Sequence, residues 1–313
     1  MLGHNYTSYF FKHRGSSLIY HLSGLVACIA WGASFIATKN LINDGLNPVE
    51  IYIYRFFIAY VCTLLVCPTP LWSHSVKDEL VFLLCGVCGG SVFFISENTS
   101  VQYTLVSNVS LITTTSPLLT AMIVGVLYKT QRPTSGFIFG SIMAFLGVAC
   151  VIFNSSFQAQ LNPLGDTLAV VSAIVWAVYC VLLRPLGSVY SSWFISRKVF
   201  FYGIITALPF LAVEPHLTPI MDIVTSKEIL MNLGFLGLVC SMLAYVLWAV
   251  CVSRLGSVKS GNYLYISPIV TLVLSAWLLS EPVTLVGVIG CVMILGGVIL
   301  SEKLGRKRGL GAS

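Results

Sequence analysis

Long apolar segments alternate with short polar ones along almost the whole chain. A helix that crosses a bilayer needs about 20 mainly apolar residues, and the polar interruptions recur at close to that interval. The pattern predicts ten transmembrane helices at residues 18–38, 50–67, 80–97, 105–127, 135–153, 166–184, 198–213, 230–250, 260–280 and 283–301. These segments are continuously apolar, so they lack the alternation of a transmembrane β-barrel. We therefore expect an all-α integral membrane protein.

Composition leads to the same fold class. Apolar residues make up 57% of the chain and charged residues only 9%, whereas a soluble domain has roughly 25% charged residues. All ten cysteines lie in apolar segments, and only Cys85 and Cys88 have a redox-like or zinc-like spacing. Because there is no second pair and no histidine nearby, we expect neither a metal nor another cofactor.

The distribution of cations orients the helices. With the N-terminus in the cytoplasm, ten helices place 14 of the 17 Lys and Arg residues on the cytoplasmic side, the exceptions being Lys39, Lys227 and the intramembrane Arg55. This is the bias that membrane proteins show, so both termini are expected in the cytoplasm. The net charge of +6 follows from the same bias and indicates no nucleic-acid partner.

The first apolar segment starts after Arg14 at full spanning length, which favours a retained helix over a cleaved signal peptide.

Short sequence matches divide the chain into two related halves. Ser-Pro-Leu-Leu-Thr at 116–120 recurs as Ser-Pro-Ile-Val-Thr at 267–271, an offset of 151 residues. Matches at offsets of 145 or 150 residues are Trp31 with Trp176, Lys39 with Arg184, Gly140 with Gly290 and Gly147 with Gly297. Five helices per half is an odd number, so the halves enter the membrane from opposite sides. Such inverted repeats are common in secondary transporters.

The repeat gives the expected organisation of the chain. We predict a cytoplasmic N-terminal segment at 1–17, a first repeat at 18–155, a second repeat at 163–301 and a basic cytoplasmic tail at 302–313. The lipid bilayer is then the main partner, and the protein could act as a monomer or a homodimer.

Three cations are candidates for function. Lys39 and Arg184 occupy equivalent helix ends, where a long side chain can reach the interface at little cost. That reading is favoured for Arg184, whereas Lys39 violates the charge bias and is equally compatible with a role in a cavity. Arg55 lies about five residues into the second segment. A guanidinium at that depth either fixes packing through a counter-charge or helix-end carbonyls, or lines a pathway and attracts an anionic group.

Glu97 is the best candidate for a titratable carboxylate within the membrane. It ends the third predicted segment. An acid at a helix end is more often simply solvated, and a role in proton coupling is the alternative. Small-residue pairs such as Gly86 with Gly90 indicate close helix packing and carry no information about a substrate.

Pro117 and Pro268 each interrupt a predicted helix, where they favour a kink or hinge. Polar residues precede both, and because equivalent helices carry them, a substrate cavity is favoured over mere satisfaction of the freed backbone. Aromatic residues could form its walls. The candidate substrate-binding residues are Trp31, Lys39, Arg55, Asn108, Trp176, Tyr179, Asn262 and Tyr263.

Several of these residues carry a resemblance to a known family. The run from Trp31 to Lys39, then Arg55-Phe56, Ser116-Pro117, Ser280-Glu281-Pro282 and Gly296-Gly297 resembles the EamA-type transporters of the drug/metabolite transporter superfamily. The resemblance extends over about residues 18–301. It implies ten helices in two inverted repeats around a central cavity, which is lined chiefly by helices one, three, four, six, eight and nine. It also implies transport of small metabolites, often amino acids, across the cytoplasmic membrane and frequently outward.

Carried over residue by residue, Trp31, Lys39, Arg55, Pro117, Pro268 and Glu281 match recurrent positions of the family. One departure matters. Small multidrug relatives use a carboxylate in the first helix for proton exchange, and the first helix here has none. The resemblance therefore does not support that coupling or polyspecific cation export.

The leading hypothesis is a secondary transporter for a small polar metabolite, such as an amino acid, that works by alternating access. Lys39 and Arg55 favour solutes with a carboxylate or phosphate. The alternative is a flippase or a carrier of a lipid-linked or nucleotide-sugar-type metabolite. No Gly-X-Ser-X-Gly or His-Glu-X-X-His motif occurs, so an enzyme is disfavoured.

Overall fold

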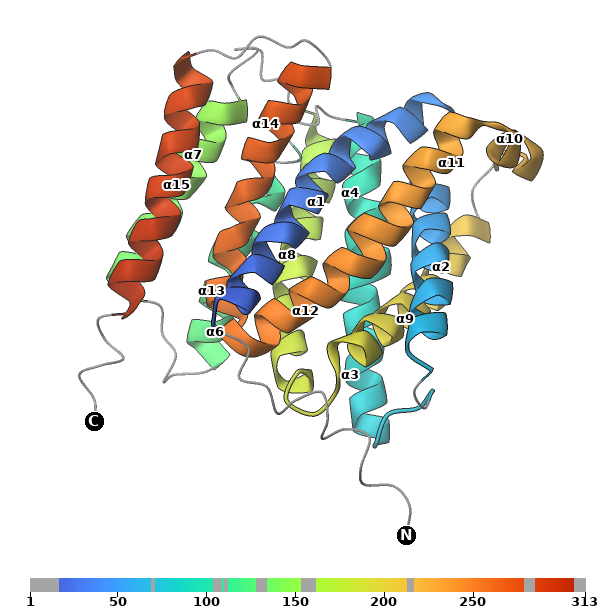
Figure 1. Ribbon diagram of the computed structural model, residues 1–313, viewed down its shortest axis with the longest axis horizontal. Helices are drawn as coiled ribbons and strands as arrows, with labels where there is room; N and C mark the ends of the chain where they lie inside the picture. The colour runs from blue at the N-terminus through green and yellow to red at the C-terminus, as the bar shows by residue number, and fades with distance from the viewer. Residues whose placement is uncertain are drawn as a thin grey trace.

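The fold is a bundle of helices (Figure 1). The computed structural model describes residues 17–68, 71–103, 109, 112–127, 134–152, 162–212, 217–278 and 285–306, and none of these residues lies in a strand. The first half contains α1 (Ser17–Asn43), α2 (Pro48–Val66), α3 (Val76–Gly86), η1 (Val87–Ser91), α4 (Val92–Tyr103), α6 (Ser116–Leu127) and α7 (Ser135–Ile152). The second half contains α8 (Pro163–Leu186), α9 (Ser192–Ala212), α10 (Ile220–Thr225), α11 (Lys227–Gly234), η3 (Phe235–Leu243), α12 (Ala244–Leu255), α13 (Ser257–Gly261), η4 (Asn262–Ile266), α14 (Ser267–Leu278) and α15 (Leu285–Arg306).

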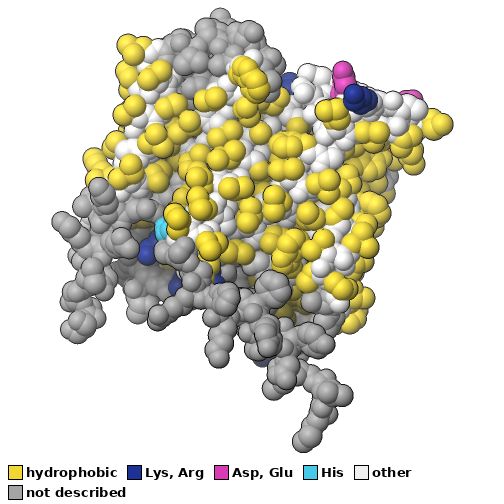
Figure 2. Space-filling model, in the orientation of Figure 1, with side chains coloured by type: hydrophobic (Ala, Val, Ile, Leu, Met, Phe, Trp, Pro, Cys, Tyr) yellow, Lys and Arg dark blue, Asp and Glu magenta, His cyan; other side chains and the backbone are white. Residues whose placement is uncertain are grey.

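The predicted all-helical membrane fold is confirmed. Six helices are long and apolar enough to cross a membrane: Leu18–Asn43, Pro48–Val66, Val76–Tyr103, Pro163–Leu186, Ser192–Ala212 and Lys227–Leu255. Three of the other four predicted segments overlap shorter apolar stretches, Ser116–Leu127, Ser135–Gly147 and Leu285–Leu300, and the fourth overlaps α14. The short helix α10 was not predicted. Large apolar side chains cover the outer face between the two ends of the bundle (Figure 2), as lipid requires.

Two of the long helices contain a π-helical segment in the middle. In the first half η1 joins α3 to α4, and in the second half η3 joins α11 to α12. Both composite helices start at a serine whose hydroxyl caps the first turn, Ser75 in one half and Ser226 in the other. These caps lie 151 residues apart, which is the offset of the Ser-Pro repeat. The halves therefore share a detail of local geometry that their apolar pattern does not reveal.

Contacts between the halves are reciprocal. A Cβ atom on Gly147 of α7 would lie 2.7 Å from the Gly290 carbonyl oxygen of α15, and one on Gly297 of α15 would lie 2.5 Å from that of Gly140. Each of the two matched glycine pairs thus meets the other pair in space, where α7 and α15 lie side by side (Figure 1). This is the arrangement that a pseudo-twofold relation between two repeats produces.

The same relation holds deeper in the bundle. Gly86 lets α3 approach Tyr202 and Gly203 of α9, and Gly237 lets η3 approach Ile58 and the Arg55 carbonyl of α2. Helix α2 begins with a capping box, in which Asn47 accepts from the backbone and Glu50 reaches back to the Asn47 N–H. Helix α9 begins after Ser191, which caps Phe194 and lies 144 residues after Asn47.

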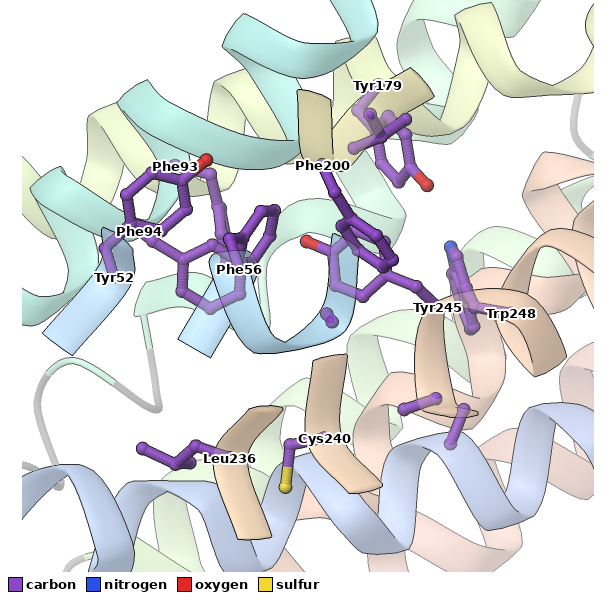
Figure 3. Packing of buried hydrophobic residues seen from close by; sticks show 14 of the residues in the cluster. Tyr52, Phe56, Phe93, Phe94, Tyr179, Phe200, Leu236, Cys240, Tyr245 and Trp248 are labelled. Atoms are coloured by element: carbon purple, nitrogen blue, oxygen red, sulfur yellow. The ribbon is translucent and has the colours of Figure 1, made fainter. Parts of the chain in front are cut away.

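Aromatic rings fill the centre between these helices (Figure 3). Phe56 of α2 packs edge-on against Phe94 of α4, Phe200 of α9 and Tyr245 of α12, with ring centroids between 5.1 and 5.6 Å apart. This aromatic core closes one side of the space in which the candidate site lies.

Candidate substrate cavity

A cavity with about 580 Å³ of empty space, its open mouth included, lies between helices of both halves. Its described lining residues are Trp31, Ser34, Phe35, Phe93, Phe94, Glu97, Thr113, Thr114, Ser116, Trp176, Leu264 and Ser267. They come from α1, α4, the segment before α6, α8, η4 and the start of α14. Predicted helices one, three, four, six and nine thus contribute, whereas helix eight packs behind the wall through Trp248.

Residues matched by the repeat line this cavity together. The rings of Trp31 and Trp176 meet edge to face, with centroids 5.2 Å apart and an interplanar angle of 89°. Ser116 and Ser267, which begin the repeated Ser-Pro motifs, also line the cavity. The Trp31 indole N–H donates to the carbonyl of Cys240 at 2.9 Å, and this bond fixes the ring against η3. The cavity therefore lies where the pseudo-twofold relation brings the two halves together.

Glu97 supplies the carboxylate of the cavity. It lies on α4, one turn after Phe93 and Phe94, so the three side chains share one helix face. It has no hydrogen bond or ion pair with any described residue. Arg55 is close enough to attract it electrostatically, without a contact within 4 Å. The carboxylate is therefore available to a ligand.

Arg55 lies behind the cavity wall. Its side chain is 1% exposed, its Nε donates to Ser241 Oγ at 2.9 Å, and its guanidinium carbon lies 4.4 Å from the centroid of the Phe94 ring. Phe94 lines the cavity, whereas Arg55 does not. Its Nη2 atom has no described partner. Glu50, the nearest acid in the sequence, binds the Thr218 backbone and hydroxyl.

The remaining predicted residues are not brought together. Lys39 is half-buried near the end of α1 and is not among the lining residues. Tyr179 is buried in the core against Gly89, and Asn262 is buried in η4 with its Oδ1 unpartnered among the described residues. Tyr263 bonds to His21 through its hydroxyl. Asn108 and Glu281 lie outside the described residues.

Pro117 and Pro268 lie where the helical geometry changes. Each is the second residue of a helix, α6 and α14, and each follows a local irregularity: a turn at Thr114 and Thr115, or the 3-10 segment η4. Proline suits that position because the first N–H groups of a helix have no partner within it. The prolines thus mark where helices four and nine restart beside the cavity.

Sequence reasoning missed Ser34, Phe35, Phe93, Phe94 and Leu264. A signal was present for two of them, since Phe93 and Phe94 lie three and four residues before Glu97 in an apolar helix. In the part of the chain that the structure describes, no group of three or more His, Cys, Asp or Glu side chains could hold a metal ion.

Comparison with known proteins identifies the family. Residues 18–153 and 163–302 each match the EamA-like transporter family. The chain belongs to this family. A transporter of Archaeoglobus fulgidus of unknown substrate is 24% identical over 90% of this chain and 96% of its own length. A protein of Streptantibioticus cattleyicolor named a probable terminal-alkyne amino-acid exporter is 24% identical over 91% of this chain and 94% of its own length.

The EamA fold is also found in a solved structure. A crystal structure with 18% identity superposes with a TM-score of 0.74 and covers 92% of this chain and 98% of that chain. At this identity the likeness concerns the fold alone. By family the chain is thus a multi-pass membrane transporter. The cavity is its candidate site for substrate binding.

Proposed function

We propose that the protein is a secondary carrier that moves a small polar metabolite, an amino acid or a related compound, outward across the cytoplasmic membrane by alternating access. One observation carries the proposal: the cavity is built by repeat-equivalent residues of both halves, Trp31 with Trp176 and Ser116 with Ser267. A site shared by two pseudo-symmetric halves can open to either side when the halves exchange conformations.

The lining of the cavity supports a small solute. Ligand sites that are mainly apolar, with a few placed polar groups, are typical for small molecules. Here five aromatic side chains and Leu264 form the apolar walls, while Glu97 and the hydroxyl groups supply the polar contacts. No cation lines the cavity in the described ranges, which disfavours a phosphate-bearing nucleotide sugar.

Orientation and direction belong to the same proposal. Helix α1 begins and α15 ends at the same end of the bundle (Figure 1). The predicted excess of Lys and Arg lies on this side, so we place both termini in the cytoplasm. The name of the Streptantibioticus relative supports export of an amino-acid-type compound.

A substrate panel tests the proposal. Purified protein in liposomes is loaded with single radiolabelled amino acids, amines or organic acids, and efflux is followed with and without a pH gradient. We expect saturable efflux of at least one soluble compound, and its loss in the double variant Trp31→Ala, Trp176→Ala. Protein-free liposomes are the control. Flux of lipid-linked compounds alone, with none of any soluble compound, would contradict the carrier and favour a flippase.

A further inference from the structure

We infer that the cavity recognises an organic ammonium group, held by the Glu97 carboxylate within aromatic walls. This inference rests on the proposed function and names its substrate class. It replaces the expectation, drawn from Lys39 and Arg55, that the solute is held by an anionic group. Three independent features of the cavity support it: its charge, its hydrogen-bonding capacity and its aromatic surface.

The ionisable group of the cavity is acidic. Glu97 is the one ionisable side chain among the described lining residues, and it has no ion-pair partner within 4 Å. A carboxylate without a contact partner, facing a cavity inside the membrane, is stabilised by a ligand cation. Neither Lys39 nor Arg55 reaches the lining, so neither competes for the same contact.

Two hydroxyl groups of the cavity are acceptors. A serine hydroxyl has one proton to donate and two lone pairs. Ser34 donates its proton to the Trp31 carbonyl at 2.7 Å, and Ser267 donates its proton to the Cys28 carbonyl at 2.9 Å. What these two groups retain is accepting capacity. An ammonium group, which has only donors, is their complementary partner.

The walls provide aromatic surface. Trp31, Phe35, Phe93, Phe94 and Trp176 line the cavity around Glu97. Cations are attracted to the faces of such rings, with tryptophan the strongest, and the attraction grows when water is excluded. These rings also suit an apolar or aromatic body attached to the ammonium group.

Arg55 opposes this arrangement, but its repulsion is weaker than the attraction of Glu97. Its guanidinium lies across the Phe94 ring and would repel a cation in the cavity. Coulomb energy falls with distance, so a direct hydrogen bond to Glu97 outweighs repulsion from a charge beyond the wall.

Three probes that share one ring and differ in one group test the inference. Benzylamine is a cation at pH 7, benzyl alcohol is neutral and benzoate is an anion. Isothermal titration calorimetry on the purified full-length protein in detergent measures their affinities without any transport. We expect benzylamine to bind at least about tenfold more tightly than either other probe, the ratio that one desolvated cation–π or ionic contact provides.

The variant Glu97→Gln keeps the shape of the side chain and removes its charge. We expect it to lose the preference for benzylamine while the affinity for benzyl alcohol stays unchanged. Glu228→Gln is the matched control, since Glu228 is exposed in the first turn of α11, outside the cavity. Should Glu97→Gln not fold, the order of the three probes on the natural protein decides alone.

Benzoate binding as tightly as benzylamine, retention of the preference in Glu97→Gln, or no binding of any probe would each overturn the inference. Its failure is distinguishable from that of the carrier proposal. Benzylamine binding without flux of any soluble compound in liposomes would support the ammonium site and contradict the carrier. Saturable flux without an ammonium preference would do the reverse.

Discussion

At one end of the bundle α9 packs against α3 and η1, and at the other end α2 packs against α11 and η3. The first contact contains an ion pair, Lys198 Nζ to Glu79 Oε1 at 2.7 Å, to which Tyr202 adds a hydrogen bond. By the capping offsets of 151 and 144 residues, the equivalents of Glu79 and Lys198 are Leu230 and Tyr54. The scaffold is thus shared, but one end is closed by charges and the other is not.

The difference separates two kinds of residue. Positions that both halves share, namely helix caps, close-packed glycines, the prolines that start α6 and α14 and the paired tryptophans, build the architecture. Two charged positions of the first half have no charged counterpart in the second: by the same offsets Glu97 corresponds to Trp248, and Arg55 to Val199. We infer that the symmetric set makes two conformations similar in energy and that the asymmetric set decides which solute and which conformation are favoured.

The largest effect is expected from breaking the shared scaffold. In Gly86→Ala the new Cβ would lie 2.5 Å from the Tyr202 Cβ and 2.8 Å from the Gly203 nitrogen, and in Gly237→Ala 2.7 Å from Ile58 Cγ2. Both variants should lose most of their folded protein, because overpacking at a helix contact costs roughly 1–3 kcal/mol or more. Fluorescence-detected gel filtration after heating measures this loss.

Gly234→Ala is the matched control for these two variants. It lies on the same composite helix as Gly237, and a Cβ there would meet no atom within 4 Å. Its thermal stability should equal or slightly exceed that of the natural protein, since alanine favours helix. If Gly237→Ala were as stable as Gly234→Ala, the reciprocal close packing of η3 on α2 would be wrong.

The second effect concerns Arg55. Arg55→Ala removes the bond to Ser241 and the contact with Phe94, so that the wall of the cavity loses its support and Glu97 its nearest cation. We expect transport in liposomes to fall by more than about tenfold, the factor that about 1.4 kcal/mol provides. Membrane insertion, measured by the yield of monodisperse protein, should fall less. Unchanged uptake would contradict a role for Arg55 at the site.

The third effect tests the charged end. Lys198 is almost fully buried beside Glu79, and its Nζ also lies 4.9 Å from the Trp72 ring centroid. Lys198→Met leaves the Glu79 carboxylate without its ion partner, which should destabilise the fold by roughly 3 kcal/mol. A thermal melt measures it. Lys227→Met, at the exposed start of α11, is the control and should leave the melting temperature unchanged.

The architecture could be predicted from the sequence because its signals are local. Apolar length, Ser-Pro repeats and the glycine matches fix helices and their pairing without knowledge of the third dimension. The sequence does not show toward which face of the bundle a residue points. Glu97, expected to be solvated or proton-coupling at a helix end, lines the cavity. Arg55, expected deep in the membrane, packs against the Phe94 ring and does not line the cavity.

Residues that depend on interhelical contacts were the hardest to place. Tyr179 and Asn262 lie in helices that border the cavity, yet the side chains of both are buried in the core. Phe35 and Leu264 line the cavity although their sequence neighbourhood is ordinary apolar helix. Periodicity assigns a helix but not its rotation about its axis when nearly all of its residues are apolar.

The smallest effect is expected at the helix ends matched by the repeat. Lys39 and Arg184 are equivalent in sequence, and both are half-buried. Lys39 has no described partner, whereas Arg184 approaches Gly256, whose φ of 84° turns the chain between α12 and α13. Lys39→Ala should therefore raise the transport of an ammonium solute several-fold without loss of stability, because its charge lies one helical turn beyond Phe35 and repels a cation that enters or leaves. Arg184→Ala should lower the melting temperature and leave the apparent affinity for the transported solute unchanged.

Initial transport rates over a range of solute concentrations, compared with thermal melts of the same preparations, measure the effects of both variants. Equal behaviour of the two variants would show that position in the repeat, and not local surroundings, sets the role of these cations.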